Sequence, residues 1–501
     1  RAAVAAGTNI TYKILYNDAV AMTGGQPVDG SISVAEIARQ VQAEGVVEVI
    51  VLSDDPDRHR NTGLPANVRV GHRDELDAVQ RHLREVKGTT VLIYEQTCAA
   101  EKRRRRKRGQ FPDPAKRLFI AKEVCEGCGD CSVQSTCVSL TPVETAMGRK
   151  REIDQSSCNK DYSCLNGFCP SFITVRGAEP RKPSALEIDE ARFAAIPTPP
   201  VAPLDQDGFD IIVAGIGGTG VVTVGALIGM AAHMEGKRMS LFDMTGLSQK
   251  NGAVYSHVRI SDGARRPATQ RIARGGADLL LAFDMVAGTG AEAVDTLRMG
   301  KTRAIANTDL TATVAFQFDR SAQLDRFMLL SKFEKLVGKD AICSVDASSL
   351  ARKVLGDTIG ANMFMVGIAA QMGLLPVGVE ALESAIELNG VSVGFNRKAL
   401  HLGRLYVSDP AFLESLTRSD TDRPEVLPTG LDEIVAHRSA HLEQYQNAAL
   451  ASSYRALVSK VADAERAVAP QSEDLAVAVA LNYAKLLAYK DEYEVARLLT
   501  S

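Results

Sequence analysis

Strands and helices are predicted to alternate through the first part of the chain. Runs of apolar residues predict buried strands at 9–16, 46–52 and 89–94. Apolar residues at helical spacing predict helices at 33–43 and 74–86. Because strands that alternate with helices usually build a sheet covered by helices, this pattern predicts an α/β domain.

A second block of the same kind begins at Phe209. An apolar strand runs into the turn Gly215–Gly220, and a helix rich in small and apolar residues follows at 221–234. The alternation then continues with strands predicted at 237–242, 277–283 and 304–307 and helices at 291–299 and 325–337. We therefore expect a second α/β domain.

Two segments lack this alternation. Residues 179–207 are rich in proline and charge, which predicts an extended linker that crosses a surface. From Gly430 onward the pattern is helical, and we expect the segment to pack on a part of the protein outside this chain or on a second subunit. Its apolar stripe is predicted to run through Leu475, Val479, Tyr483 and Leu486.

Seven of the nine cysteines lie between the two α/β blocks. Cys125, Cys128 and Cys131 form a CxxCxxC motif, and Cys169 precedes Pro170. Closely spaced thiolates with a cysteine-proline pair are typical of the bacterial ferredoxin arrangement for four-iron clusters. The segment therefore predicts iron-sulfur chemistry.

The cysteine segment repeats itself in weakened form, and the repeat predicts two ligand sets. When the halves are superposed, the first motif matches Cys158, Asp161 and Cys164, so a carboxylate replaces the middle cysteine. The fourth cysteine of each ferredoxin motif binds the other cluster. The first set is therefore Cys125, Cys128, Cys131 and Cys169, and the second is Cys137, Cys158 and Cys164 with Asp161 as an optional oxygen ligand.

Carboxylate binds cluster iron more weakly than thiolate does. We therefore expect the second cluster to be a [3Fe-4S] cluster, or a [4Fe-4S] cluster with one labile iron. Structural zinc is the alternative, but zinc sites usually show two CxxC pairs well apart. Disulfides are less favoured, because nothing else in the sequence indicates secretion.

The loop after the first strand carries a resemblance to a known family. Tyr-Asn17-Asp-Ala19 followed by Thr23-Gly24-Gly25-Gln26 resembles the second half of the thiamine-diphosphate motif of 2-oxoacid:ferredoxin oxidoreductases, most closely the large fused indolepyruvate type. The resemblance implies that Asn17 and the carbonyl of Ala19 bind Mg²⁺, and that Thr23, Gly24, Gly25 and Gln26 contact thiamine diphosphate. The Gly-Asp-Gly that opens the motif is missing, and we expect it upstream of Arg1.

The turn Gly215–Gly220 admits two interpretations. A GxGxxG turn between a strand and a helix, with Asp243 about twenty residues on, is typical of NAD(P) or flavin binding. The same segment and Gln249-Lys250, however, resemble the gamma-type domain of this oxidoreductase family. That resemblance implies that Gly217, Gly218, Thr219, Gln249 and Lys250 contact coenzyme A or cover the active site.

Two polar features of the sequence stay open. Ser256 and His257 either contact the acyl intermediate or coenzyme A, or point outward from an edge strand. The basic run Lys102–Arg108 is either a solvated loop or a surface that steers an acidic ferredoxin, and a nucleic-acid interpretation is weaker.

Bulk composition favours no particular partner. Formal net charge is −3 and 45% of the residues are hydrophobic. No signal peptide or apolar run of membrane-spanning length is present. We therefore expect a cytoplasmic protein without nucleic-acid or membrane partners.

Together these features predict a multidomain α/β protein with a helical end. The expected order is the end of a thiamine-diphosphate-binding domain (1–114), a ferredoxin-like iron-sulfur domain (115–178), a linker (179–207), a Rossmann-like gamma-type domain (208–425) and a helical segment (426–501).

The resemblance implies an enzyme that oxidises an aryl or branched-chain 2-oxoacid to its acyl-CoA and passes electrons to ferredoxin. Its partners would be ferredoxin, the missing N-terminal part of the enzyme, and further copies of the same chain. An NAD(P)- or flavin-linked iron-sulfur oxidoreductase and a non-catalytic electron-transfer subunit remain alternatives. No catalytic acid or base is assigned.

Overall fold

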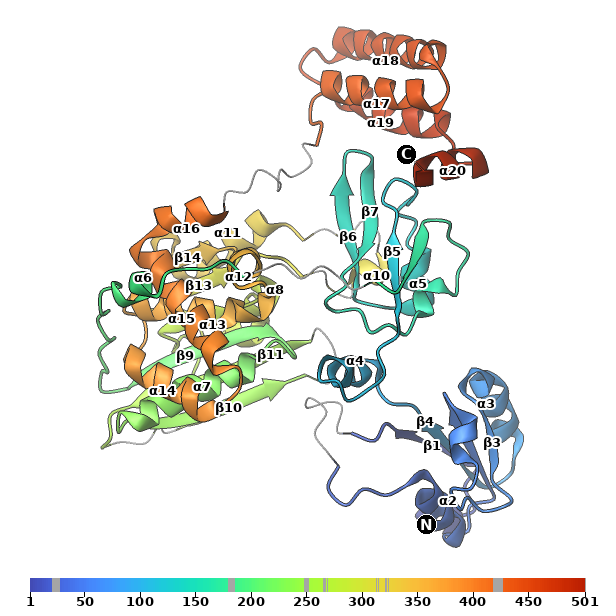
Figure 1. The fold of residues 1–501 in the computed structure, drawn as a ribbon, viewed down its shortest axis with the longest axis vertical. Coiled ribbons are helices and arrows are strands. Elements are labelled where there is room, and N and C mark those ends of the chain that lie inside the picture. The colour runs from blue at the N-terminus through green and yellow to red at the C-terminus, as the bar shows by residue number, and fades with distance from the viewer. Residues whose placement is uncertain are drawn as a thin grey trace.

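Figure 1 shows an N-terminal α/β unit, a small β region, a large α/β unit and a helical unit, in chain order. This computed structural model describes residues 1–19, 28–178, 185–246, 252–264, 267, 269–311, 313, 315–319, 322, 324–417 and 427–500. No helix among those residues is long and apolar enough to cross a lipid bilayer.

The N-terminal unit is a parallel sheet with helices on both faces. Its strands are β1 (Ile10–Tyr16), β2 (Glu48–Ser53), β3 (Arg69–His72) and β4 (Thr89–Glu95), in the order β1-β4-β2-β3. Helix α2 (Val34–Ala43) packs on Val49 and Val51, whereas α3 (Leu76–Glu85) packs on Ile50 and Leu52. Successive strand residues thus face opposite helices, as pleating requires.

The predicted elements of this unit agree with the structure to within a few residues. Helix α2 begins where Ser33 and Glu36 form a reciprocal capping box, which satisfies backbone N–H groups at the helix start. Helix α1 (Ala2–Ala5) opens the unit. The short elements that escaped prediction are β3 and the two 3₁₀ turns at Pro56–His59 and Arg73–Glu75. Helix α4 (Ala99–Lys107) occupies most of the basic run, where a solvated loop was one expectation.

The small β region consists of two antiparallel pairs. Strand β5 (Lys116–Ile120) pairs with β8 (Phe172–Arg176), and β6 (Leu140–Thr145) pairs with β7 (Gly148–Ile153) as a hairpin. Helix α5 (Asp130–Ser135) and the 3₁₀ turn Ser163–Leu165 each contain the third cysteine of a motif. The sequence repeat is therefore also a repeat of structure, since β5 and β7 each lead into a cysteine motif.

The large α/β unit is built on a six-stranded sheet in the order β10-β11-β9-β12-β13-β14. Its strands are β9 (Phe209–Ile216), β10 (Arg238–Thr245), β11 (Ala253–Ser261), β12 (Leu279–Ala282), β13 (Arg303–Asn307) and β14 (Ile342–Val345). Strands β9, β12, β13 and β14 are parallel neighbours, whereas β11 is antiparallel to both β9 and β10.

Helices cover both faces of this sheet. The larger core includes residues of α7 (Val221–Met234), α12 (Ala347–Leu355), α13 (Ala361–Gln371), α14 (Val379–Asn389) and α15 (Val393–Ser408). The opposite core includes residues of α8 (Met285–Gly288), α9 (Ala291–Val294) and α11 (Arg326–Val337). Two shorter helices, α10 (Ala315–Phe318) and α16 (Pro410–Thr417), and the 3₁₀ turns Lys339–Ala341 and Thr358–Gly360 complete the unit.

The described part of the proline-rich segment is packed on the large unit. It contains helix α6 (Glu190–Ala194), and both Ile188 and Ile196 are buried in the larger core. The Leu186 and Ala202 amides donate to carbonyl oxygens of the unit at 2.9 Å each. This part of the segment is therefore a strap fixed to the unit's surface.

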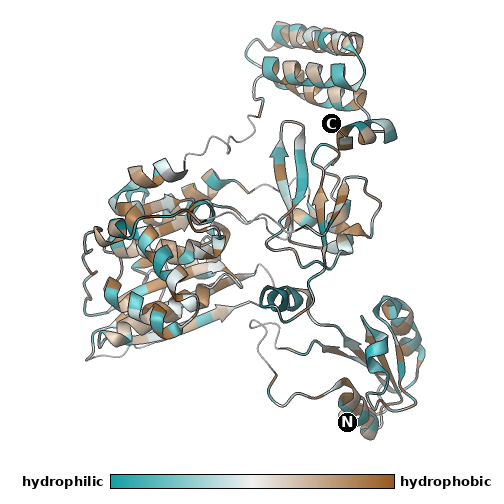
Figure 2. Ribbon diagram, in the orientation of Figure 1, coloured by the Kyte–Doolittle hydropathy of each residue, from teal (hydrophilic) through white to brown (hydrophobic). Residues whose placement is uncertain are grey.

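The helical unit contains α17 (Leu431–Tyr445), α18 (Ala448–Val468), α19 (Asp474–Leu487) and α20 (Glu492–Thr500). The predicted apolar stripe is wrong at its ends, because Leu475 and Leu486 are 56% and 78% exposed. The residues of α19 buried in the core are the alanines Ala476, Ala480 and Ala484. Small side chains let this helix approach its neighbours closely, and Figure 2 shows mixed polarity around these helices.

Candidate functional site

The structure brings the cysteines together in the two sets that the repeat predicts. Burial, together with the nearby thiols of Cys125, Cys169 and Cys128, raises the pKa of Cys131 to about 11. We call these four residues the first thiol group. Of these four, Cys125 and Cys131 are buried, and Cys128 is exposed.

The remaining residues form a second thiol group of Cys137, Cys158 and Cys164 with Asp161. Burial raises the pKa of Cys164 to about 12, with further contributions from Cys137, Cys158 and Asp161. Both groups thus contain thiols that stay protonated at neutral pH unless a cation takes the place of the proton.

The loops around the two groups have the same backbone course. Gly127 and Gly129 adopt φ angles of 64° and 81°, and the equivalent Lys160 and Tyr162 adopt 55° and 62°. In each loop an amide donates to the first sulfur: Gly127 N lies 3.3 Å from Cys125 Sγ, and Lys160 N lies 3.4 Å from Cys158 Sγ. These turns wrap backbone donors around the sulfurs, as thiolate ligands need.

The donor sets consist almost entirely of thiols. Within the described ranges, no three His, Cys, Asp or Glu side chains are grouped closely enough to hold one metal ion. The thiols of each set are nonetheless near enough to interact electrostatically. Soft thiolate donors suit iron-sulfur clusters and zinc alike, so the iron-sulfur interpretation stays a prediction.

Two arginines beside the thiols have buried N–H groups without a hydrogen-bond acceptor. Arg151 is 2% exposed, and its Nη2 donates to Phe316 O at 2.8 Å. Its Nη1 has no hydrogen-bond partner. Cys131 lies close enough for the charge of Arg151 to affect its pKa. Arg103 also has a buried Nε without a hydrogen-bond partner, and Asp154 and then Cys158 lie near enough to interact with its charge. Burial of a cation is costly unless anions lie nearby, so each guanidinium fits a site that holds negative charge.

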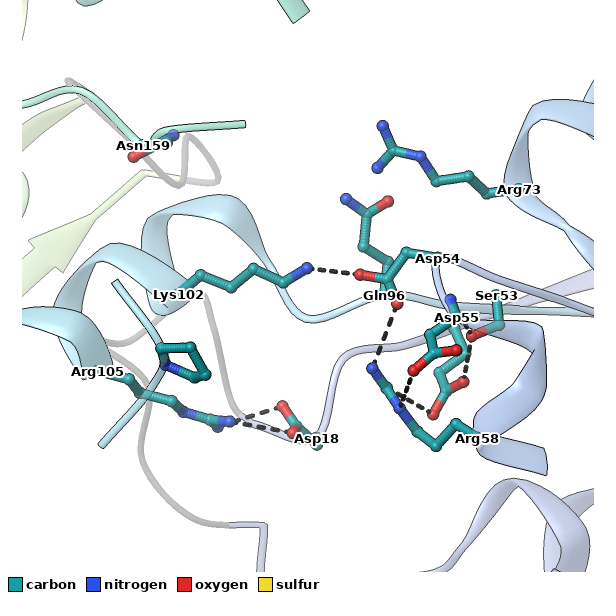
Figure 3. Close-up of polar contacts among 12 residues, drawn as sticks. Asp18, Ser53, Asp54, Asp55, Arg58, Arg73, Gln96, Lys102, Arg105 and Asn159 are labelled. Atoms are coloured by element: carbon teal, nitrogen blue, oxygen red, sulfur yellow. Dashed lines mark hydrogen bonds and ion pairs between the residues drawn. The ribbon is translucent and has the colours of Figure 1, made fainter. Parts of the chain in front are cut away.

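Helix α4 contacts both the N-terminal unit and the loop around Cys158, and Figure 3 shows Lys102 and Arg105 reaching Asp54 and Asp18. On the sheet side, Lys102 pairs with Asp54 at 2.5 Å, and Arg105 makes a bidentate pair with Asp18 at 3.0 and 3.2 Å. On the other side, Arg103 donates to Ser156 O at 3.3 Å and Arg106 to Asn159 O at 2.7 Å, on either side of Cys158.

These contacts change how the basic run is interpreted. Four of its cations hold other parts of the chain, and Lys107 and Arg108 are the exposed members. A solvated loop is therefore wrong for most of the run. Steering of a ferredoxin stays a prediction that only the exposed pair supports.

The predicted cofactor loop is described only in part. Asn17 Oδ1 accepts the Ala19 amide at 3.3 Å, and Asp18 between them has φ of 54°. This turn lies at the carboxyl end of β1, where open α/β sheets bind ligands. Thr23, Gly24, Gly25 and Gln26 lie outside the described residues, so their contacts with thiamine diphosphate stay a prediction.

A polar cluster at the same sheet edge was missed from the sequence. The side chain of His59 is 6% exposed and lies 2.6 Å from Glu95 Oε2. Ser53 Oγ also donates to Glu95 Oε2, at 2.8 Å. Ser53 and Glu95 end β2 and β4, so register alone would place them side by side once the strand order is known. The nearby His72 and His82, by contrast, are exposed.

The glycine turn of the large unit is anchored by several hydrogen bonds. The Gly217 amide donates to Gly252 O at 2.8 Å, and Asn362 Nδ2 donates to Thr219 O at 2.9 Å. Gly218 has φ of 86° with open space where a Cβ would lie. A ligand can therefore approach this backbone closely.

Other predicted residues of this unit do not join the turn. Gln249 and Lys250 lie outside the described residues. Ser256 and His257 are 0% and 1% exposed, so they do not point outward from an edge strand. His257 Nδ1 accepts the Ile272 amide at 3.3 Å, and burial, followed by the charge of Arg271, lowers the pKa of His257 to about 4. Neither residue lines the cavity described next.

Strand order disfavours the dinucleotide interpretation of this turn. In a dinucleotide-binding unit the second strand pairs directly with the first and carries the acid that binds the ribose. Here β11 lies between β9 and β10, and Ser256 of β11 is the residue paired with Asp243 of β10. Asp243 is therefore two strand spacings, roughly 10 Å, from the strand that leads into the turn.

A cavity of about 910 Å³ opens at the carboxyl edge of the six-stranded sheet. The sheet side contributes Thr219, Asp284 and Asn307, which follow or end β9, β12 and β13. The β6–β7 hairpin contributes Arg149 and Glu152 to the facing wall. The volume suits a small-molecule ligand, and the location is the usual one in open α/β sheets.

Comparison with known proteins matches the chain in two places. Residues 210–406 match the family described as pyruvate ferredoxin/flavodoxin oxidoreductase. Residues 431–501 match a family of unknown function, DUF6537.

Two curated relatives are similar over part of the chain. The indolepyruvate oxidoreductase subunit IorB of Archaeoglobus fulgidus is 31% identical over 204 residues, 39% of this chain and 92% of that protein. The subunit of the same name from Pyrococcus horikoshii is 28% identical over 203 residues, 39% of this chain and 94% of that protein.

Among solved structures, the pyruvate oxidoreductase subunit PORC from Thermotoga maritima is 22% identical, with a TM-score of 0.29. The match covers 39% of this chain and 94% of that one.

Proposed function

Since the chain belongs to the pyruvate ferredoxin/flavodoxin oxidoreductase family and contains a part like subunit IorB, we propose that it serves a 2-oxoacid:ferredoxin oxidoreductase. The reaction would convert an aryl or branched-chain 2-oxoacid, such as indolepyruvate, to its acyl-CoA. Its remaining active-site residues would come from the rest of a fused enzyme, and homodimers or larger assemblies would form from the complete chain.

The grouping of seven thiols into two sets is the observation that carries this proposal. Iron-sulfur clusters accept and release single electrons, which a two-electron oxidation with a ferredoxin acceptor requires. The first thiol group would hold one [4Fe-4S] cluster, and the second would hold a [4Fe-4S] or [3Fe-4S] cluster. Arg151 and Arg103 would donate their unpartnered N–H groups to these anionic sites.

The N-terminal sheet edge would hold thiamine diphosphate and Mg²⁺. Asn17 and the Ala19 carbonyl would supply oxygen ligands, which suit this hard cation. Arg105 would keep the turn in place through Asp18, although it touches neither ligand atom. The same helix reaches the loop of Cys158, so the predicted cofactor turn and the second thiol group share one support.

Coenzyme A would enter at the edge of the six-stranded sheet. Gly217, Gly218 and Thr219 offer a turn whose backbone is open to a ligand, and the adjoining cavity has room for part of it. This site assignment is independent of the thiol groups and fails separately from them.

Anaerobic purification of the intact assembly tests the function directly. We expect iron and acid-labile sulfide, tightly bound thiamine diphosphate, and 2-oxoacid-dependent reduction of ferredoxin that requires coenzyme A. Absence of iron and sulfide would overturn the proposal. Iron without thiamine diphosphate in the whole assembly would instead identify an electron-transfer subunit.

A further inference from the structure

The helical unit meets the small β region at two points. Lys490, in the turn between α19 and α20, donates to Glu123 O at 2.6 Å and pairs with Glu126 Oε1 at 2.7 Å. Arg438 of α17 contacts the sulfur of Met147, which lies in the turn of the β6–β7 hairpin. Figure 1 shows the two bodies side by side at these turns.

The contacts of Lys490 supply an acceptor for each donor of its largely covered ammonium group. Its side chain is 14% exposed, and its third acceptor is Val124 O at 3.4 Å. An ammonium group has three N–H donors, so two carbonyls and one carboxylate use all of them. Removal of a charge from water is unfavourable unless such partners are in place, which indicates a specific contact.

The acceptors of Lys490 surround a predicted cluster ligand. Glu123 and Val124 precede Cys125, and Glu126 follows it. Lys490 therefore holds the backbone just before a buried thiol of the first group and the Glu126 side chain just after it. Burial and the charge of Lys490 also lower the pKa of Lys150, next to the same loop, to about 8.

We propose that the helical unit, residues 431–500, is a cap that holds the loop of the first thiol group in its ligand-binding conformation, with Lys490 as the anchor. The proposal rests on the function proposed above, because it presumes a cluster in that group. It assigns a role to the part of the chain that matches a family of unknown function.

The rate of cluster loss in the full-length chain tests the cap. Lys490→Met removes the anchor, and outer-shell partners of metal ligands are typically worth 10–100-fold. We expect an iron chelator to remove the first cluster about tenfold faster than from the wild type. The second cluster, followed separately by electron paramagnetic resonance, should be lost at the wild-type rate.

Two further variants separate capping from a local effect of charge. Lys485→Met is the matched control, because Lys485 is 69% exposed and reaches Glu126 only at 3.6 Å, so the loss rate should stay near wild type. Arg438→Met loosens the second contact without touching the cysteine loop, and should also speed loss of the first cluster. The rate of hydrogen exchange in residues 121–127 should rise in both Lys490→Met and Arg438→Met.

The outcomes distinguish this proposal from the function on which it rests. A wild-type chain without iron and sulfide would end both. A wild-type chain with two clusters, and Lys490→Met clusters as durable as wild type, would end only the cap. Faster loss in Lys490→Met but not in Arg438→Met would also overturn the cap, since the lysine would then act alone. Circular dichroism verifies that the helices remain folded.

Discussion

The two thiol groups are built on the same backbone from different residues. The first loop uses Gly127 and Gly129 at its left-handed positions, whereas the second uses Lys160 and Tyr162. Side chains at such φ angles cost roughly 1 kcal/mol each. The second loop offsets this through a Lys160–Asp113 ion pair and a Tyr162 hydroxyl that donates to Lys116 O at 2.9 Å.

The halves also differ in ligand and in support. Cys128 stands where the second half has Asp161, so one group contains four thiols and the other three and a carboxylate. The first group is contacted by the helical unit through Lys490, and the second by α4 through Arg103 and Arg106. The shared turn is therefore the constant element, and ligand and support are what vary.

Removal of one thiol from each half should have the largest effect. Cys131→Ser should abolish the first cluster and Cys164→Ser the second, because serine does not replace a buried thiolate ligand of iron. Each variant should lose about half of the bound iron, measured by chelation assay. Cys343→Ser, in β14 of the large unit, is the control and should keep wild-type iron. Loss of both clusters in either variant would show that the halves are not independent.

An exchange of the differing ligand should convert one half into the other. Asp161→Cys supplies a fourth thiolate, so the second cluster should keep its fourth iron after mild oxidation, whereas the wild type should give a three-iron resonance signal. The reciprocal Cys128→Asp should make the first cluster lose an iron under the same conditions. The idea that this ligand distinguishes the two clusters is wrong if the wild type gives no three-iron signal, or if both variants give the same signal as the wild type.

Substitution at Gly127 in the first cysteine loop should destabilise the protein more than substitution at Lys160, the equivalent residue of the second loop. A Cβ at Gly127 would lie 2.4 Å from Arg149 O and would also strain a left-handed residue. We expect Gly127→Ala to lower the free energy of unfolding of the iron-loaded protein by roughly 2–3 kcal/mol. Lys160→Ala keeps a side chain at the equivalent turn and loses only a partly exposed ion pair, below about 1 kcal/mol. Equal losses in chemical denaturation would contradict the difference.

The buried arginines should act each on its own half. Arg151→Met removes the cation beside Cys131, and Arg103→Met removes the one beside Cys158. A hydrogen bond from a charged donor is worth about 1.5 kcal/mol or more, so each variant should lower the midpoint potential of its own cluster by on the order of 60 mV. Redox titration followed by resonance spectroscopy measures both clusters in one sample, and lysine variants should recover part of the shift. An unchanged midpoint potential would show that the arginine does not tune its cluster.

Local pattern predicted much of the fold. Strands β1, β2, β4 and β9 and helices α2, α3 and α7 follow from hydrophobic runs, periodicity and caps, all of which are properties of neighbouring residues. The two cysteine sets could also be predicted from the sequence, because an internal repeat fixes which positions are equivalent. Alanines of α19 escaped prediction, since a small residue carries little hydrophobic signal although it permits the closest packing.

What depends on contacts distant in sequence could not be predicted. Helix α4 looked like a solvated charge run, because acceptors such as Asp18 and Asn159 are 87 and 53 positions away from the arginines that they bind. The His59–Glu95 pair needs the strand order β4-β2, and the insertion of β11 between β9 and β10 is invisible in a GxGxxG pattern. Sequence motifs specify a turn, whereas topology specifies what lies beside it.

The hollow at the edge of the six-stranded sheet has walls from two bodies of the molecule. Arg149 and Arg151 of the hairpin donate to Ala322 O and Phe316 O, and Gln317 donates back to Leu140 O at 3.2 Å. Neither body encloses that space by itself. A covalent tether between them keeps the second wall at high effective concentration, so closure is intramolecular and insensitive to dilution. An architecture with the same two bodies on separate polypeptides would lose that advantage and bind its ligand only as tightly as its subunits associate.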